Sequence, residues 1–314
     1  MPNLAMRSAK KSRPIIDVKR LKKSWQLYFI IFLPLAFILL FHYGPMYGIQ
    51  IAFKDYDVTA GIWKSEWVGL KNFTRFIGSY NFKTIVWNTI SISLYSLILG
   101  LPIPIMLAIS LNECEVKWYK KLVQTVTYAP HFISMVVMVS MIILSLSLNN
   151  GIINNIVATL GGERVNFMSK PELFKTIYII SGIWQGMGYS AILYLAVLTG
   201  IDPNLYEAAL IDGASRFKKI IYIDLPFLVP TIIIMLILSL GSVMNVGFEK
   251  IYLMQNKLNL SASETISTYV YKIGIENANF SYSTVISLFN SVVNMMMIII
   301  VNYIARKVSE TSLW

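Results

Sequence analysis

Eight side chains with hydrogen-bonding or ring-stacking groups interrupt or border the long apolar stretches of this sequence. Amides and carboxylates are expensive to place in a membrane, so they usually face the interior of a helix bundle or a water-filled path. Such groups hydrogen-bond hydroxyls, and aromatic rings stack on apolar ring faces, a combination that suits a sugar. The candidates for a substrate path are Asn88, Trp184, Gln185, Tyr189, Asn245, Glu249, Asn290 and Asn294.

Hydrogen bonding between neighbouring helices is the alternative role for each of these groups. Asn290 and Asn294 are four residues apart, so they share a helix face. Gln185 and Tyr189 can also share a helix face, and Trp184 lies on a different one. Glu249 stands at the outer end of its apolar stretch, where a gate or a contact with an extracellular protein is a further interpretation.

The sequence contains no pattern typical of a catalytic or metal-binding site. Cys114 is the single cysteine, and His42 and His131 lie far apart, so they do not form a zinc ligand set. We expect His131 to be hydrogen-bonded within a bundle rather than to relay protons. The phosphate-binding pattern G-x-x-x-x-G-K-[ST] does not occur in the sequence. We therefore expect no catalysis, and no cofactor or metal bound by this chain.

The composition predicts an integral membrane protein. Of the 314 residues, 56% are hydrophobic and 14% are charged, and the mean hydropathy is +0.61. Soluble domains have about 45–50% apolar and about 25% charged residues. Since about 20 apolar residues cross a bilayer, six stretches qualify or nearly qualify as spans: 26–41, 86–111, 122–148, 173–199, 227–248 and 282–305. The predicted fold is an all-α bundle of six transmembrane helices, the second kinked at Pro102 and Pro104.

The distribution of charge orients these helices. The net charge is +11, and eight basic residues precede the first apolar stretch. Because Lys and Arg are enriched on the cytoplasmic side, we predict that both termini are cytoplasmic. The domains are then a basic segment 1–25, a transmembrane domain 26–305 and a tail 306–314. We interpret the basic stretch 18–23 as a topology signal, with a helix on anionic lipid as the alternative; we expect no nucleic-acid partner.

Two further patterns predict local structure. The loop at about 52–84 is rich in aromatic residues, which favours short helices at the membrane surface. Gly182 and Gly186 form a G-x-x-x-G pattern, typical of close packing between membrane helices, and Gly188 adds a third small residue nearby.

The loop between the fourth and fifth apolar stretches has the most distinctive spacing. Asp202 can cap a helix and Pro203 suits its first position. Gly213 should end that helix, and a second short helix then leads to Pro226, where the next span begins. This predicts a helix–turn–helix on the inner face, tied to two membrane helices, that can transmit a push from a cytoplasmic partner.

This loop resembles that of the permease subunits of bacterial binding-protein-dependent ABC importers. Their loop reads EAA, three residues, G, nine residues, I-x-LP, and every fixed position is present here, from Glu207 to Pro226. The resemblance implies a type I importer permease fold and a coupling helix that docks on a separate ATPase. The residues it assigns to that role are Glu207, Ala208, Ala209, Asp212, Gly213, Leu225 and Pro226.

The segments 41–56, 69–73, 279–284 and 290–294 resemble the branch of this family that imports complex oligosaccharides. The resemblance implies an oligosaccharide substrate and a multi-pass location among the lipids of the bacterial cytoplasmic membrane. It also implies three kinds of partner: a second related permease in a heterodimer, two ATPase subunits that use ATP and Mg²⁺, and an extracellular solute-binding lipoprotein. The alternatives are the same permease class importing a non-sugar solute, a glycan-modifying membrane enzyme, and a membrane sensor.

Overall fold

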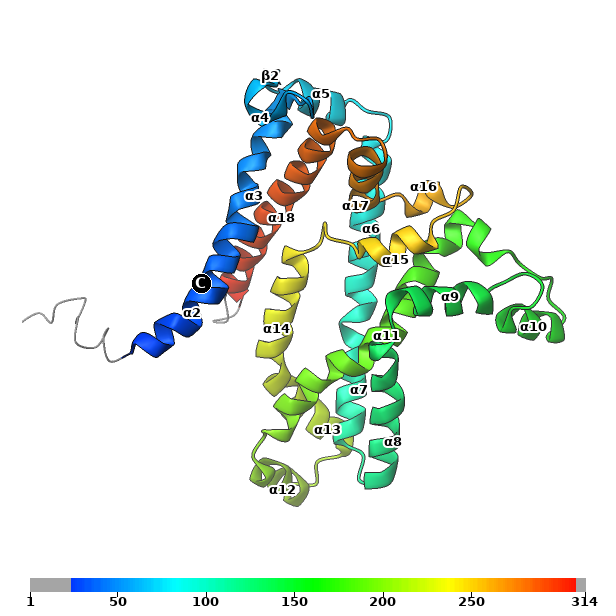
Figure 1. Cartoon of the computed structure of the whole chain (residues 1–314). Helices are drawn as coiled ribbons and strands as arrows, with labels where there is room; N and C mark the ends of the chain where they lie inside the picture. Colours follow the sequence, from blue (N-terminus) through cyan, green and yellow to red (C-terminus); the bar gives the residue numbers. More distant parts are fainter. Residues whose placement is uncertain (1–23, 309–314) are drawn as a thin grey trace, which may run out of the picture. The chain divides into compact units, whose positions relative to one another are not determined.

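The computed structural model describes residues 24–308 and is mostly helical (Figure 1). It divides into two compact units, Met1–Gln50 and Ile51–Trp314. The predicted basic segment up to residue 23, including the stretch 18–23, lies outside the described residues, as does the tail from 309 onward.

The first unit is formed by one helical run. Helix α2 (Trp25–Ile38) continues through a π-helical turn (Leu39–Tyr43) and α3 (Gly44–Met46) into a 3₁₀ turn (Tyr47–Phe53). Its most apolar stretch has no buried residue within the structure. A helix that is apolar on every side is stable in lipid rather than in water. The first predicted span is therefore a long apolar helix that extends beyond residue 41.

The second unit contains the remaining elements. Its long helices are α6 (Phe82–Gly100), α7 (Pro102–Asn112), α8 (Lys117–Tyr128), α9 (Met135–Ser145), α11 (Pro171–Thr199), α14 (Leu225–Gly241) and α18 (Phe280–Val308). Its short helices are α4 (Gly61–Lys64), α5 (Lys71–Ile77), α10 (Ile152–Thr159), α12 (Pro203–Ile211), α13 (Arg216–Lys219), α15 (Phe248–Met254), α16 (Leu260–Ser263) and α17 (Ile266–Tyr271). Further 3₁₀ turns cover Ala129–Phe132 and Phe167–Ser169, and π-helical turns cover Ile220–Asp224 and Lys272–Glu276.

Four helical runs of the described chain are long and apolar enough to span a membrane: Trp25–Phe53, Phe82–Asn112, Arg216–Gly241 and Phe280–Ile304. The bent pair Lys117–Phe132 and Met135–Ser145 is a fifth when its two halves are counted as one span. The fourth predicted span corresponds to α11, which has 29 residues and is long enough to cross. Its polar and small residues, among them Gln185 and Gly186, make it less apolar than those four runs.

Proline shapes two of the predicted spans. The second is interrupted at Leu101, immediately before α7 begins at Pro102, because proline lacks the N–H that would continue the helix. The prediction of one continuous helix over 122–148 was wrong. Its two halves meet at 104°, since the 3₁₀ turn Ala129–Phe132, which contains Pro130, ends the first half and the Ser134 side chain caps α9 by accepting from the Val137 N–H.

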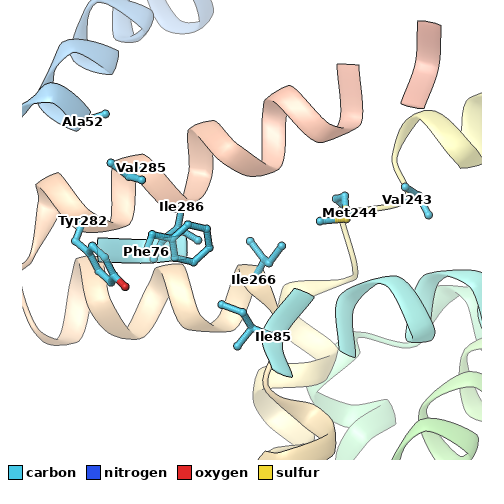
Figure 2. Packing of buried hydrophobic residues seen from close by; sticks show 9 residues of the cluster. All are labelled: Ala52, Phe76, Ile85, Val243, Met244, Ile266, Tyr282, Val285 and Ile286. Atoms are coloured by element: carbon cyan, nitrogen blue, oxygen red, sulfur yellow. The ribbon is translucent and has the colours of Figure 1, made fainter. Parts of the chain in front are cut away.

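The aromatic loop at about 52–84 folds against the start of α18. As the sequence predicts, it forms the short helices α4 and α5; it also contains strands β1 (Lys54–Asp55) and β2 (Glu66–Trp67), paired antiparallel with Lys54 opposite Trp67. Phe76 of α5 is fully buried, with its ring 6.2 Å from Tyr282 and 5.4 Å from Phe289. Figure 2 shows this cluster, which includes Val285 and Ile286 of α18. Ring packing thus anchors the loop to the bundle.

Close packing of α11 depends on Gly188. A Cβ atom there would lie 2.2 Å from the Thr127 carbonyl oxygen of α8. A Cβ atom at Gly186 would have no heavy atom within 4 Å, and one at Gly182 would lie 3.1 Å from Lys250 Nζ. The backbone contact between helices therefore occurs at Gly188 and not at the G-x-x-x-G pair.

Candidate functional site

The segment 202–226 forms the predicted helix–turn–helix. Asp202 caps α12 by accepting from the Asn204 N–H at 3.0 Å, and Pro203 occupies the first helical position. Gly213 has φ of +69°, the left-handed conformation that glycine adopts at a helix end. The chain then forms α13, the π-helical turn Ile220–Asp224, and α14 without a break.

This segment presents apolar side chains to solvent. Leu210 is 61% exposed, Ile211 87% and Phe217 70%. Glu207 and Asp212 are also exposed on the same segment. In the second unit, α12 and α13 lie at the end opposite α5 (Figure 1). Exposed apolar side chains rimmed by charges are typical of a protein-binding surface. We call the exposed residues of 205–217 the α12 surface.

Buried polar contacts fix the α12 surface to the bundle. Tyr206 Oη donates a hydrogen bond of 2.5 Å to Oδ1 of Asp224, which is fully buried. Lys219 Nζ lies 3.9 Å from Glu113 Oε2, and both side chains are largely buried. The pair of Arg216 with Glu115 is exposed, so it contributes little. The segment is therefore linked both to the start of α14 and to the loop after α7.

Two adjoining cavities lie in the second unit, and residues of α6, α7 and α11 line both of them. Their volumes are about 360 and 480 Å³, and both are lined by Ser96, Tyr178, Ser190 and Gly247. The smaller is further lined by Ser93, Ser239, Ser242 and Asn245, so α14 and the loop that follows it contribute to its wall. Hydroxyl groups are both donors and acceptors. The cavities therefore offer a polar lining within apolar helices.

Three of the predicted path residues line these cavities. Asn245 lines the smaller one, and Gln185 and Glu249 line the larger. Gln185 also donates to the Ile133 carbonyl oxygen at 3.2 Å, which joins α11 to the bend between α8 and α9. The structure thus brings these three residues to one polar region.

The other three asparagines make hydrogen bonds within the protein. Asn88 is 3% exposed and donates to the Ser261 and Glu264 carbonyl oxygens. Asn294 is 8% exposed and accepts from the Met244 N–H at 3.0 Å. Asn290 donates to Asn245 Oδ1 at 2.9 Å. These contacts match the alternative in which such groups join helices.

The aromatic candidates lie apart from each other. Tyr189 stacks on His131, with ring centroids 3.9 Å apart and planes 3° apart. Trp184 lines a different, apolar cavity between α9 and α11, together with Met141 and Ile180. They do not join Gln185 at the polar cavities.

Sequence reasoning missed the serines and Lys250. Ser93 and Ser96 are three residues apart, as are Ser239 and Ser242, a spacing that puts each pair on one helix face. That repeat is the signal in the sequence for a hydroxyl-lined helix face. Lys250 followed the predicted fifth span, and no pattern showed that it would be buried.

Residues 100–310 match the family described as binding-protein-dependent transport system inner membrane component. The chain belongs to this family. It is 41% identical to protein LplB of Bacillus subtilis (strain 168), covering 94% of this chain and 92% of LplB. It is 39% identical to the polygalacturonan/rhamnogalacturonan transport system permease protein YteP of the same organism, covering 97% and 95%.

A solved structure shows the same architecture. The crystal structure of a bacterial alginate ABC transporter, in complex with periplasmic protein bound to an alginate pentasaccharide, contains a chain 38% identical to this one. The TM-score is 0.87, and the match covers 94% of this chain and 99% of that chain. This member of the family is therefore a multi-pass membrane permease of a binding-protein-dependent ABC transport system, a transport component rather than an enzyme.

Proposed function

We propose that this chain carries oligosaccharides across the bacterial cytoplasmic membrane as one of two related permease subunits. Its six spans are the α2 run, α6 with α7, the α8–α9 pair, α11, α14 and α18, with both termini in the cytoplasm. The hydroxyl-lined cavities support a polar, sugar-like cargo. The names of relatives support it as well, because they include an arabinooligosaccharide permease that is 30% identical and the alginate transporter.

We propose further that the α12 surface docks on the ATPase subunit. Glu207 would pair with polar or basic groups there, while Ala208 and Ala209 permit a close approach and Asp212 and Gly213 form the turn. The exposure of Ile211 and Phe217 supports a protein partner. A heterodimer of permeases, two ATPases that use ATP and Mg²⁺, and an extracellular solute-binding lipoprotein complete the assembly. Membership of a binding-protein-dependent transport family supports a separate ATPase and a binding protein as partners.

One structural relationship carries this proposal. The α12 surface continues through the π-helical turn into α14, which begins at Leu225-Pro226 and lines the smaller cavity with Met235 and Ser239. Tyr206 reinforces that path by its bond to Asp224. A displacement of α12 would therefore move one wall of the cavity.

The mechanism that fits this path is alternating access. ATP-driven closure of the ATPases moves the two coupling helices together and opens the cavities to the extracellular binding protein. The oligosaccharide enters, and hydrolysis resets the permeases so that the cavities open inward. The chain supplies the moving wall and the polar lining, while the ATPase performs the chemistry.

Site-specific cross-linking tests the docking. Cys114 is replaced by serine, and a single cysteine is placed at Ile211 or, as a matched exposed control, at Leu160, which is 82% exposed. We expect an ATP-dependent cross-link to the ATPase from position 211 and none from position 160. An assembled complex with no cross-link from 211, or with equal cross-linking from both, contradicts the proposed docking.

A further inference from the structure

Lys250 of α15 is a buried cation that has no anionic partner in the part of the chain that the structure describes. It is 4% exposed, and no carboxylate of the described residues forms an ion pair with its ammonium. Its Nζ donates to the Tyr178 carbonyl oxygen at 2.6 Å and lies 4.5 Å from the centre of the Tyr178 ring. Burying an ammonium costs several kcal/mol unless a partner offsets it, and one carbonyl and one ring offset that cost incompletely.

The ammonium lies at the wall of the larger cavity. Lys250 and Gly182 both line that cavity, and a Cβ atom at Gly182 would be 3.1 Å from Nζ. Gly182 therefore leaves the space that the ammonium occupies. Ser96, Gln185 and Ser190 line the same cavity, so hydroxyl and amide groups surround the cation.

The remaining charge in this region does not neutralise Lys250. Among the described residues that line either cavity, Lys250 is the one cation and Glu249 the one carboxylate. Glu249 is exposed, whereas Lys250 is buried, and consecutive residues of a helix point about 100° apart. Solvent screens the exposed carboxylate more strongly than the buried ammonium. An incoming carboxylate could therefore pair with Lys250 despite Glu249.

Resting on the proposed oligosaccharide transport, we propose that Lys250 binds a carboxylate of the passing sugar, so that the permease favours acidic, uronate-bearing oligosaccharides over neutral ones. The sugar carboxylate supplies the missing partner, while the neighbouring serines and Gln185 hydrogen-bond ring hydroxyls. Lys250 follows the fifth span, and burial lowers the pKa of its ammonium to about 7. A carboxylate at its side raises that pKa again, so binding and protonation reinforce each other.

A matched pair of probes isolates the charge. The complete transporter in proteoliposomes is supplied with binding protein saturated with trigalacturonate or with its methyl ester, which has the same backbone without the carboxylates. Wild-type protein, Lys250→Met, Lys250→Arg and the exposed-lysine control Lys257→Met are compared by the ratio of initial uptake rates, acid over ester. The binding protein is the same throughout, so its own preference cancels between variants.

We expect the acid-to-ester ratio to fall about tenfold in Lys250→Met, as loss of one charge-assisted hydrogen bond predicts, with ester uptake retained. Lys250→Arg and Lys257→Met should keep the wild-type ratio. An unchanged ratio in Lys250→Met overturns the inference but leaves oligosaccharide transport intact. If Lys250→Met does not assemble, the wild-type protein alone provides the test. Equal uptake rates for trigalacturonate and its methyl ester, both at saturation, would then overturn the inference. Absence of uptake of every oligosaccharide would instead overturn the proposed function, and this inference with it.

Discussion

The hydroxyl of Tyr206 in α12 donates a 2.5 Å hydrogen bond to Asp224, the residue immediately before α14. Asp224 is fully buried, and its second oxygen, Oδ2, has no hydrogen-bond partner among the described residues. The Tyr206 bond is therefore the main polar support of that carboxylate. It also fastens the α12 surface to α14, a helix that lines the smaller cavity. In the proposed mechanism this bond helps to transmit motion of α12 to α14.

Tyr206→Phe removes this support with almost no change in shape. Because it leaves a buried carboxylate without its donor, we expect a loss of about 1–3 kcal/mol in unfolding free energy, seen as a lower thermal midpoint of the purified permease complex. We also expect less transport per ATP hydrolysed, since α12 is no longer fastened to α14. Tyr80→Phe, at a side chain that is 95% exposed, is the control. Wild-type stability and coupling in Tyr206→Phe would contradict the role of this bond.

The Tyr206–Asp224 bond should be insensitive to pH around neutrality. Burial, and then the hydrogen bond to Asp224, raise the pKa of Tyr206 above its usual 10. A native pKa above the unfolded value contributes stability that is complete below the unfolded pKa and is lost as pH rises through the native pKa. The stability difference between wild type and Tyr206→Phe should therefore be constant over about pH 6 to 9 and shrink above about pH 10. A difference that already disappears by pH 8 would refute this.

Gly188→Ala should be strongly destabilising, whereas Gly186→Ala should not. A methyl group at 188 would lie 2.2 Å from a carbonyl oxygen of the α8 backbone, which cannot move aside as a side chain can. Overpacking of this kind costs about 1–3 kcal/mol or more. At 186 no heavy atom lies within 4 Å of the added carbon. The measurement is the amount of folded permease extracted from membranes and its thermal midpoint; equal values for the two variants would contradict the close contact of α11 with α8.

Glu207→Ala should leave insertion intact and weaken the link to the ATPase. Glu207 is exposed, so its loss should change unfolding free energy by no more than about 0.5 kcal/mol. We expect reduced recovery of the ATPase with affinity-purified permease, and reduced uptake. Glu163→Ala removes an exposed carboxylate from another loop and serves as the control. Normal ATPase recovery and uptake in Glu207→Ala would exclude this residue from the docking surface.

Local rules predicted the segment 202–226 because each of its signals acts locally. Asp202 caps, Pro203 begins a helix and Gly213 adopts the left-handed turn, and none of these depends on distant residues. The apolar runs similarly predicted the long helices. Composition alone could not show the 104° bend near Ser134. Mean hydropathy depends only on which residues are present, so it is the same for a straight helix and for a bent pair.

The cavity lining was harder to predict because it depends on which helix faces meet. Asn88, Asn294 and Gln185 all hydrogen-bond backbone groups, but only Gln185 also lines a cavity, because tertiary packing buries the two asparagines elsewhere. Lys250 lies near Gly182 only because α15 packs against α11. The sequence could rank these residues by the free-energy cost of placing their side chains in a membrane. It could not predict which group each side chain would contact.

We propose that an oligosaccharide in the cavities and the ATPase at the α12 surface act on one mechanical unit. The most direct test is ATP hydrolysis by the reconstituted transporter, with both permeases, the ATPase and the binding protein, measured against a panel of oligosaccharides. We expect one class of oligosaccharide to stimulate hydrolysis in the wild type and to lose that effect in Glu207→Ala. An intact complex with basal turnover that no oligosaccharide stimulates would contradict this account.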